Sequence, residues 1–320
     1  MSEDLQKQPV EDAQPSVSQF EPLSPKHWIR FEQVGGLEAL KRQARIKIIE
    51  PFKNPALFKK FNKTAGGGLL LYGPPGCGKT FFARAIAGEC NAAFFNVSIH
   101  DILDMYLGNS EKNIQALFDT ARAQRPAVIF IDEIDALGRK RELMRHSSLT
   151  TTINQFLAQL DGVESDNENL LVIGATNAPW DVDSAFRRPG RFDMTLFVPP
   201  PDQDSRQQIL AGMLSELPIG QLDYAELAQL SAHFSGADIK GWVDQVSETV
   251  IESILETGQE RLIEQADLVA QRSHLKPSTL EWLEAAKNVV EYANQSGVYD
   301  ELADYLDQHP TTKKRKIGFF

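Results

Sequence analysis

The segment Gly73-Pro74-Pro75-Gly76-Cys77-Gly78-Lys79-Thr80 constrains this chain more than any other feature of its sequence. It has the spacing G-x-x-x-x-G-K-[ST] and directly follows the apolar run Leu69–Tyr72, so it lies between an expected strand and an expected helix. Its glycines allow backbone N–H groups to turn inward around phosphate oxygens, and the helix that begins at Lys79 directs its positive end at the same anion. Lys79 can reach the β- and γ-phosphates, and the Thr80 hydroxyl can ligate Mg²⁺. The segment predicts a nucleoside-triphosphate site, and its strand-loop-helix context argues against the alternative of a simple Gly-Pro turn.

Short apolar runs alternate with helical patterns after this loop, which is typical of a parallel sheet covered by helices. Ser110 can cap a helix over Ser110–Gln124, whose apolar residues recur on one face. A second amphipathic pattern ends near Asp161-Gly162. The sequence therefore predicts an α/β domain, a P-loop αβα sandwich with five strands at Leu69–Tyr72, Ala93–Val97, Val128–Ile131, Leu170–Ala175 and Thr195–Val198.

The strand pattern ends at Pro199-Pro200-Pro201, and the remaining periodic segments are helical. They lie at Arg206–Leu214, Tyr224–His233, Ala237–Leu255, between Pro277 and Gly297, and at Tyr299–Asp307. We expect a disordered arm at 1–26, a large α/β domain at 27–200, a small all-helical lid at 201–260, a C-terminal helical extension at 261–308 and a basic and aromatic tail at 309–320.

Composition narrows the class of protein. A net charge of −11 argues against a dedicated nucleic-acid binder. The two cysteines, Cys77 and Cys90, form no disulfide framework, and Cys77 lies inside the phosphate loop, so a reducing, cytoplasmic location is expected. No apolar run approaches the roughly 18–20 residues of a membrane span, and no secretory leader is recognisable at the N-terminus.

Two acids follow the third apolar run. Val128–Ile131 leads directly into Asp132 and Glu133. A strand that places an aspartate beside a phosphate loop supplies a partner for Mg²⁺, directly or through water. Glu133 can polarise an attacking water as a general base, and an Asp-Glu pair favours hydrolysis over phosphoryl transfer to another substrate. The alternative is a strand that ends in a polar turn.

Two further polar groups are candidates for the γ-phosphate. Asn177 follows the run Leu170–Ala175 and can hydrogen-bond the γ-phosphate or the attacking water, although an isolated asparagine there is usually a turn residue. The segment Arg187–Asp193 concentrates guanidinium groups in a Pro-Gly turn. Such arginines can stabilise charge on a transferring phosphoryl group, often from a neighbouring subunit, or can be solvated surface residues.

Together these segments resemble the AAA family of ATPases, in the branch that contains katanin, spastin and the proteasomal ATPases. The loop is similar to Walker A through Phe81, Phe130–Asp135 to Walker B, Ala175–Asn177 to sensor 1, and Phe186–Asp193 to the second region of homology. In that last region Arg188 and Arg191 fall on the arginine-finger positions. The nucleotide contacts implied by the resemblance are Val34, Gly35, Gly36, Pro74, Pro75, Gly76, Cys77, Gly78, Lys79, Thr80, Phe81, Asn177, Gly236 and Ala237.

The resemblance also implies ATP and Mg²⁺ as cofactors, a helical lid and a ring that is usually hexameric. Tyr106 and Leu107 match the pore loop through which this branch threads polypeptide, with Asn109 where glutamate is more usual. The alternative for Tyr106 is a core aromatic residue. We expect one ATPase module without a folded N-terminal domain. No His-Glu-x-x-His signature occurs in the sequence, which argues against the fused-protease version of the family.

Three functions remain open at this stage. The first is a homo-oligomeric ring that remodels protein substrates, the second a motor acting on nucleic acid, and the third a nucleotide-controlled assembly scaffold. The pore aromatic favours the first, the acidic balance argues against the second, and an intact Glu133 with both arginines argues against the third. The protein substrate or adaptor is not readable from the sequence.

Overall fold

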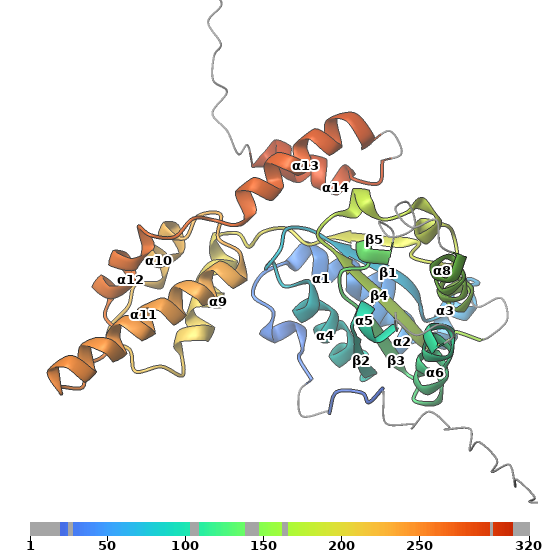
Figure 1. The fold of residues 1–320 in the computed structure, drawn as a ribbon, viewed down its shortest axis with the longest axis horizontal. Coiled ribbons are helices and arrows are strands. Elements are labelled where there is room, and N and C mark those ends of the chain that lie inside the picture. The colour runs from blue at the N-terminus through green and yellow to red at the C-terminus, as the bar shows by residue number, and fades with distance from the viewer. Residues whose placement is uncertain are drawn as a thin grey trace, which may run out of the picture.

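One parallel sheet organises the large domain of the computed structural model, which describes residues 20–24, 28–102, 109–137, 147–161, 166–294 and 297–309. Its strand order is β2-β3-β4-β1-β5, and every neighbouring pair is parallel (Figure 1). The strands are β1 (Gly67–Tyr72), β2 (Ala93–Val97), β3 (Ala127–Ile131), β4 (Leu170–Thr176) and β5 (Met194–Phe197). The predicted α/β class with five parallel strands is confirmed, and each predicted strand end lies within two residues of the observed one.

Both faces of the sheet are buried, because successive side chains of a strand point to opposite sides. Leu69, Leu71 and Phe130 pack under α1 (Glu38–Ala44), the π-helical turn Arg45–Ile49 and α4 (Lys79–Glu89). Leu70 and Ile129 face α5 (Ile99–Ile102), α6 (Asn109–Ala123) and α8 (Ser147–Asp161) on the other side. The short elements that complete this domain are α2 (Glu50–Lys53), α3 (Pro55–Lys59) and 3-10 turns at Phe31–Gln33, Pro179–Asp181 and Ser184–Arg187.

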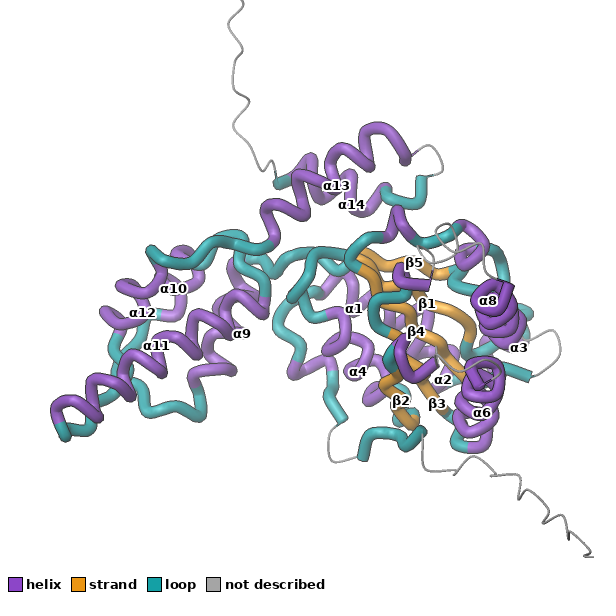
Figure 2. Tube along the Cα trace, in the orientation of Figure 1, coloured by secondary structure: helices purple, strands orange, loops and turns teal. Residues whose placement is uncertain are grey.

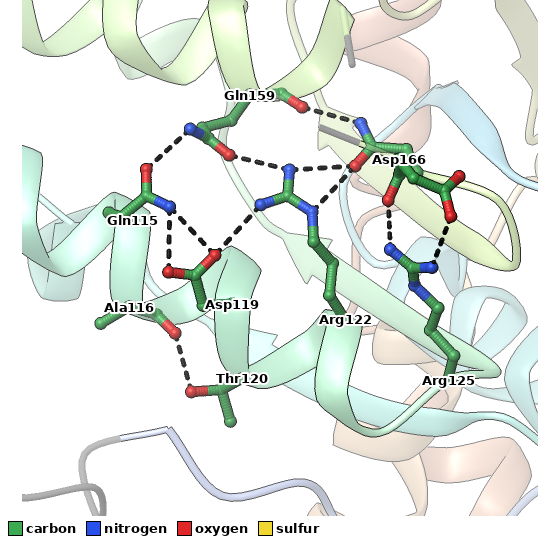
Figure 3. Close-up of polar contacts among 9 residues, drawn as sticks. Gln115, Ala116, Asp119, Thr120, Arg122, Arg125, Gln159 and Asp166 are labelled. Carbon is green, nitrogen blue, oxygen red and sulfur yellow. Dashed lines mark hydrogen bonds and ion pairs between the residues drawn. The ribbon is translucent and has the colours of Figure 1, made fainter. Parts of the chain in front are cut away.

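A polar network joins α6 to α8 on the second face (Figure 3). Gln159 of α8 accepts a 2.8 Å hydrogen bond from Arg122 of α6 and donates another of 2.8 Å to Gln115. Arg122 also donates to Asn167, which lies just before β4. These bonds fix the register of α6 and α8 and attach both helices to the chain that enters the sheet.

The helical domain lies to one side of the sheet domain (Figures 1 and 2) and has its own hydrophobic core. It is built from α9 (Gln203–Leu214), α10 (Tyr224–Leu230), α11 (Gly236–Thr257) and α12 (Gln265–Arg272). The Trp242 ring is fully buried, and its indole N–H donates to the Leu268 carbonyl of α12 at 2.9 Å. Because Ile263 and Leu268 belong to this core, we propose that the lid extends through α12, past the expected boundary at residue 260.

The last two helices leave the lid and return to the sheet. α13 (Thr279–Ala293) and α14 (Asp300–Gln308) bury Trp282, Leu283 and Leu302 against Tyr72 and Phe197, at the carboxyl ends of β1 and β5. In Figure 1 this pair lies over the β5 side of the domain. In the part of the chain that the structure describes, none of the helices combines the length and apolar character that a membrane span needs.

Candidate nucleotide-hydrolysis site

The predicted phosphate loop connects β1 to α4, as its sequence context indicated. Gly76 and Gly78 have φ angles of +72° and +88°, a region that side-chain-bearing residues rarely adopt. A Cβ at Gly76 would lie 2.7 Å from the Ala237 Cβ, whereas one at Gly78 would meet no atom within 4 Å. The loop therefore needs glycine for its turn, and it is closed on one side by the start of α11.

Lys79 is 7% exposed and directs its ammonium group into the loop. Nζ donates to the carbonyls of Gly73 and Pro74, both at 2.9 Å, and to Oδ1 of Asn177 at 2.6 Å. Burial lowers the pKa of Lys79 from 10.5 to about 8. The loop thus holds a partly desolvated ammonium group, which an anion would stabilise.

The thiol in the middle of the loop carries no charge. Cys77 is 8% exposed, and burial raises the pKa of its thiol to about 12. Cys77 and Cys90 are both free and buried, so neither forms a disulfide in this structure.

The two acids lie at the carboxyl end of β3, beside Thr80. Thr80 Oγ1 donates to Asp132 Oδ2 at 3.3 Å, and the Glu133 backbone N–H donates to Asp132 Oδ1 at 2.9 Å. Glu133 has a φ of +53° and is exposed. It lines a cavity of about 250 Å³ together with Thr80, Asp132 and Ser98. Thr80 and Asp132 are thus brought together, with Glu133 at the edge of an adjoining space that can hold water.

Asn177 joins the same site from the end of β4. Its carboxamide oxygen accepts the Lys79 ammonium, and its backbone carbonyl accepts the indole N–H of Trp282 at 2.6 Å. The preceding residue, Thr176, donates to Asp135 Oδ1 at 2.7 Å, which ties the ends of β3 and β4. Asn177 is therefore positioned by contacts on both of its sides.

The nucleotide contacts that the resemblance implies outside the phosphate loop lie where the large domain meets the helical domain. The Gly36 backbone N–H donates to Gln208 Oε1 of α9 at 3.1 Å, and the Ala237 N–H donates to the Gly76 carbonyl at 3.2 Å. Val34 is buried, Gly35 and Gly36 are half-buried, and Phe81 is 40% exposed. Val34–Gly36 thus lies against α9 and Gly236–Ala237 against the phosphate loop.

The two candidate finger arginines lie far from the phosphate loop of their own chain. A Cβ on Gly68 would lie 2.1 Å from the Arg191 carbonyl oxygen, so this segment lies at the amino end of β1. The phosphate loop follows the carboxyl end, about 13 Å further along the strand at the usual rise. The arginines are therefore not brought together with Lys79, Thr80 and Asp132.

The environments of Arg188 and Arg191 differ. Arg191 makes a two-pronged ion pair with Asp161 of α8, in which Nε and Nη2 each donate at 2.9 Å, and it donates from Nη1 to the Ala185 carbonyl at 2.7 Å. Only 17% of its side chain is exposed. Arg188 is exposed, and it lines a cavity of about 300 Å³ together with Asp161 and Arg191.

Comparison with known proteins agrees with this geometry. Residues 69–200 match the family described as "ATPase family associated with various cellular activities (AAA)". The chain contains an ATPase domain of the AAA family. A protein of Plasmodium falciparum (isolate 3D7) named as a cell division cycle ATPase is 39% identical over 229 residues, which cover 71% of this chain and 19% of that protein. The aligned region thus spans about a fifth of the relative's length.

The donors in the AAA domain fit a bound magnesium ion. Thr80 offers a hydroxyl and Asp132 a carboxylate, and Mg²⁺ in nucleotide sites takes one or two such oxygens together with phosphate oxygens and water. Among the described residues, no group of three or more His, Cys, Asp or Glu side chains could hold a metal ion without phosphate oxygens or water as further ligands. The residues present therefore suit an ion that arrives with a nucleotide.

Several contacts of the AAA domain were not predicted from the sequence. Gln208 contacts Gly36 across 172 positions, and Trp282 contacts Asn177 across 105. Neither residue lies in a recognisable motif, so no local signal could have identified them. The predicted pore-loop residues Tyr106 and Leu107 lie outside the described residues.

Proposed function

We propose that this chain hydrolyses ATP with Mg²⁺ as one subunit of a homo-oligomeric ring, a hexamer by family resemblance, and that the ring remodels protein substrates through its central pore. The position of Arg188 supports an oligomer most directly. It is exposed beside Arg191, whose backbone lies at the amino end of β1, whereas the phosphate loop of the same chain lies beyond the carboxyl end. An arginine in this position can complete the site of another copy but not that of its own chain, and head-to-tail contacts of this kind form a ring when the rotation between copies closes.

In the proposed reaction Lys79 exchanges its carbonyl partners for phosphate oxygens, and the N-terminus of α4 directs backbone N–H groups at the same anion. Glu133 accepts a proton from the attacking water, and Asn177 orients that water or the γ-phosphate. Thr80 and Asp132 would hold Mg²⁺, which when bound neutralises charge on the phosphates. Arg188 of a neighbouring copy stabilises the charge that develops on the transferred group.

The proposal of protein remodelling rests on the resemblance around Tyr106 and Leu107. The proposal of a cytoplasmic location rests on the two free cysteines. An aromatic ring can contact many different side chains through apolar area, which suits a motor that pulls on varied sequences. The substrate or adaptor is unassigned. Action on nucleic acid has no comparable support, given the net charge of −11.

Trapping the ATP-bound state tests assembly. Glu133→Gln preserves the shape of the side chain but cannot accept a proton, so ATP should stay bound and the ring should persist. Light scattering after gel filtration should show a larger species for this variant with ATP than without nucleotide. The control Lys79→Ala/Glu133→Gln should not respond to ATP, because the charge aimed at the triphosphate is lost. A Glu133→Gln protein that binds ATP and remains monomeric, or one that hydrolyses ATP at the wild-type rate, would contradict the proposal.

A further inference from the structure

The first turn of α13 lies between the helical domain and the hydrolysis site. Ser278, immediately before α13, donates from its backbone N–H and from Oγ to Asp238 Oδ2, at 3.1 and 2.9 Å. The same carboxylate oxygen accepts the Ser235 N–H at the start of α11. Thr279 adds a bond from Oγ1 to the His233 carbonyl. α13 is therefore joined to the turn that covers the phosphate loop.

One turn later the same helix contacts the hydrolysis site. Trp282 is 9% exposed, and its ring stacks on Phe197 with centroids 6.4 Å apart and planes 13° apart. Its indole N–H donates at 2.6 Å to the carbonyl of Asn177. Because an indole has one donor and this bond uses it, the ring and the end of β4 hold each other in place.

The contact continues through Asn177 to the phosphate-binding lysine. The backbone of Asn177 accepts Trp282, and its side chain accepts Lys79 at 2.6 Å. A nucleotide that draws Lys79 towards its phosphates leaves the Asn177 carboxamide without this partner. The indole bond then remains as the contact that fixes the backbone from which the carboxamide extends.

We infer that Trp282 is a positioning residue for Asn177 in ATP hydrolysis, and that the bond between Ser278 and Asp238 makes this positioning depend on where the lid sits. The inference rests on the proposed role of Asn177, and it assigns a function to α13 that the predicted motifs do not cover. Trp282 contacts no reacting atom itself. It acts on the rate by holding the end of β4 within the narrow geometry that catalysis requires.

Trp282→Phe tests this inference in the full chain with Mg²⁺ and ATP. Phenylalanine keeps a ring against Phe197 and removes the N–H donor. We expect kcat to fall about tenfold, the upper range for one hydrogen bond, while the Kd for ATP stays within about twofold. Trp180→Phe is the matched control, because the Trp180 ring packs on the Trp282 ring with centroids 5.8 Å apart. This change trims the same aromatic cluster and keeps the indole N–H that Trp282 donates to Asn177. The control should keep kcat within about twofold.

The double variant with Asn177→Ala separates positioning from a general loss of packing. If Trp282 acts through Asn177, Trp282→Phe should have no further effect on kcat in the Asn177→Ala background. Multiplied effects of the two changes, or equal losses in Trp282→Phe and Trp180→Phe, would overturn the inference. Failure of ring assembly would be visible separately, as a Glu133→Gln protein that binds ATP but does not increase in size.

A second readout needs no turnover. The indole N–H resonance that disappears in Trp282→Phe identifies Trp282 in the NMR spectrum of the protein. Addition of ADP should shift this resonance in the wild type, because Lys79 leaves Asn177, and should not shift it in Lys79→Ala. An unchanged resonance in nucleotide-saturated wild-type protein would contradict the link between Trp282 and the phosphate loop.

Discussion

The buried ammonium group of Lys79 predicts that nucleotide binding takes up protons. In the free protein burial lowers the pKa of Lys79 to about 8, so above that pH the side chain is mostly neutral. With a triphosphate bound, the charged form is strongly favoured and the pKa rises. Binding above pH 8 therefore needs a proton, and affinity must weaken as the pH increases.

The magnitude follows from the fraction of Lys79 that is charged. With a pKa of about 8, that fraction is about nine-tenths at pH 7 and about one-tenth at pH 9, so the Kd for ATP should rise about tenfold between them. At pH 8 each binding event should take up about half a proton. Calorimetry in two buffers of different ionisation enthalpy measures that uptake directly.

Lys79→Arg is the matched control, because a guanidinium group stays charged up to a pH of about 12. The larger side chain can weaken ATP binding overall, but the Kd of the Lys79→Arg variant for ATP should not change between pH 7 and 9. Cys77 does not confuse the result, since burial raises the pKa of its thiol to about 12. A wild-type Kd that is flat over this range, with a binding heat independent of buffer, would refute the assignment of a partly neutral Lys79 to the phosphate site.

Three other predictions concern separate parts of the chain. Arg191→Ala should lower the free energy of unfolding by about 1–2 kcal/mol, because it breaks the ion pair with Asp161. Arg188→Ala should change the free energy of unfolding by less than about 0.5 kcal/mol. Urea titration measures both values, and equal losses would argue against this difference. Gly36→Ala should weaken ATP binding about tenfold, because the new Cβ would lie 1.6 Å from Ser205 Oγ. In the control Gly212→Ala, in α9, the new Cβ meets no atom within 4 Å, so the measured Kd should not change. An unchanged Kd in Gly36→Ala would show that the contact with Ser205 does not shape the site. Tyr106→Ala should spare ATP turnover yet abolish unfolding of a tagged fluorescent substrate, with Tyr106→Phe nearly silent; full unfolding by Tyr106→Ala would leave threading through this loop without support.

The sheet and the phosphate site could be predicted because their signals are local. Leu69–Tyr72 and the loop after it occupy adjacent positions, and the apolar runs are short enough to identify strands in a buried parallel sheet. The carboxyl ends of parallel strands then bring Lys79, Asp132 and Asn177 to one edge without further information. The site residues of the phosphate loop could be predicted from their order along the chain alone.

The contacts that tune the site could not be predicted, because they join residues distant in sequence. Asp161 was recognised only as a helix end, yet it pairs with Arg191 across 30 positions. α12 lies in a stretch of weak pattern, where its single buried Leu268 gives little periodicity. Trp282 lies in the helical segment predicted between Pro277 and Gly297, but nothing in the sequence indicated that its indole N–H would be bound to Asn177.

Complementation between two inactive variants tests most directly whether the hydrolysis site is shared between copies. Lys79→Ala lacks a working nucleotide site but keeps Arg188, and Arg188→Ala has the opposite defect. In mixed rings formed at equal amounts, about one interface in four joins an intact site to an intact arginine, so about a quarter of the wild-type ATPase rate should return. Mixtures that exchange subunits, shown by energy transfer between labelled chains, and that remain as inactive as the separate variants would contradict the account.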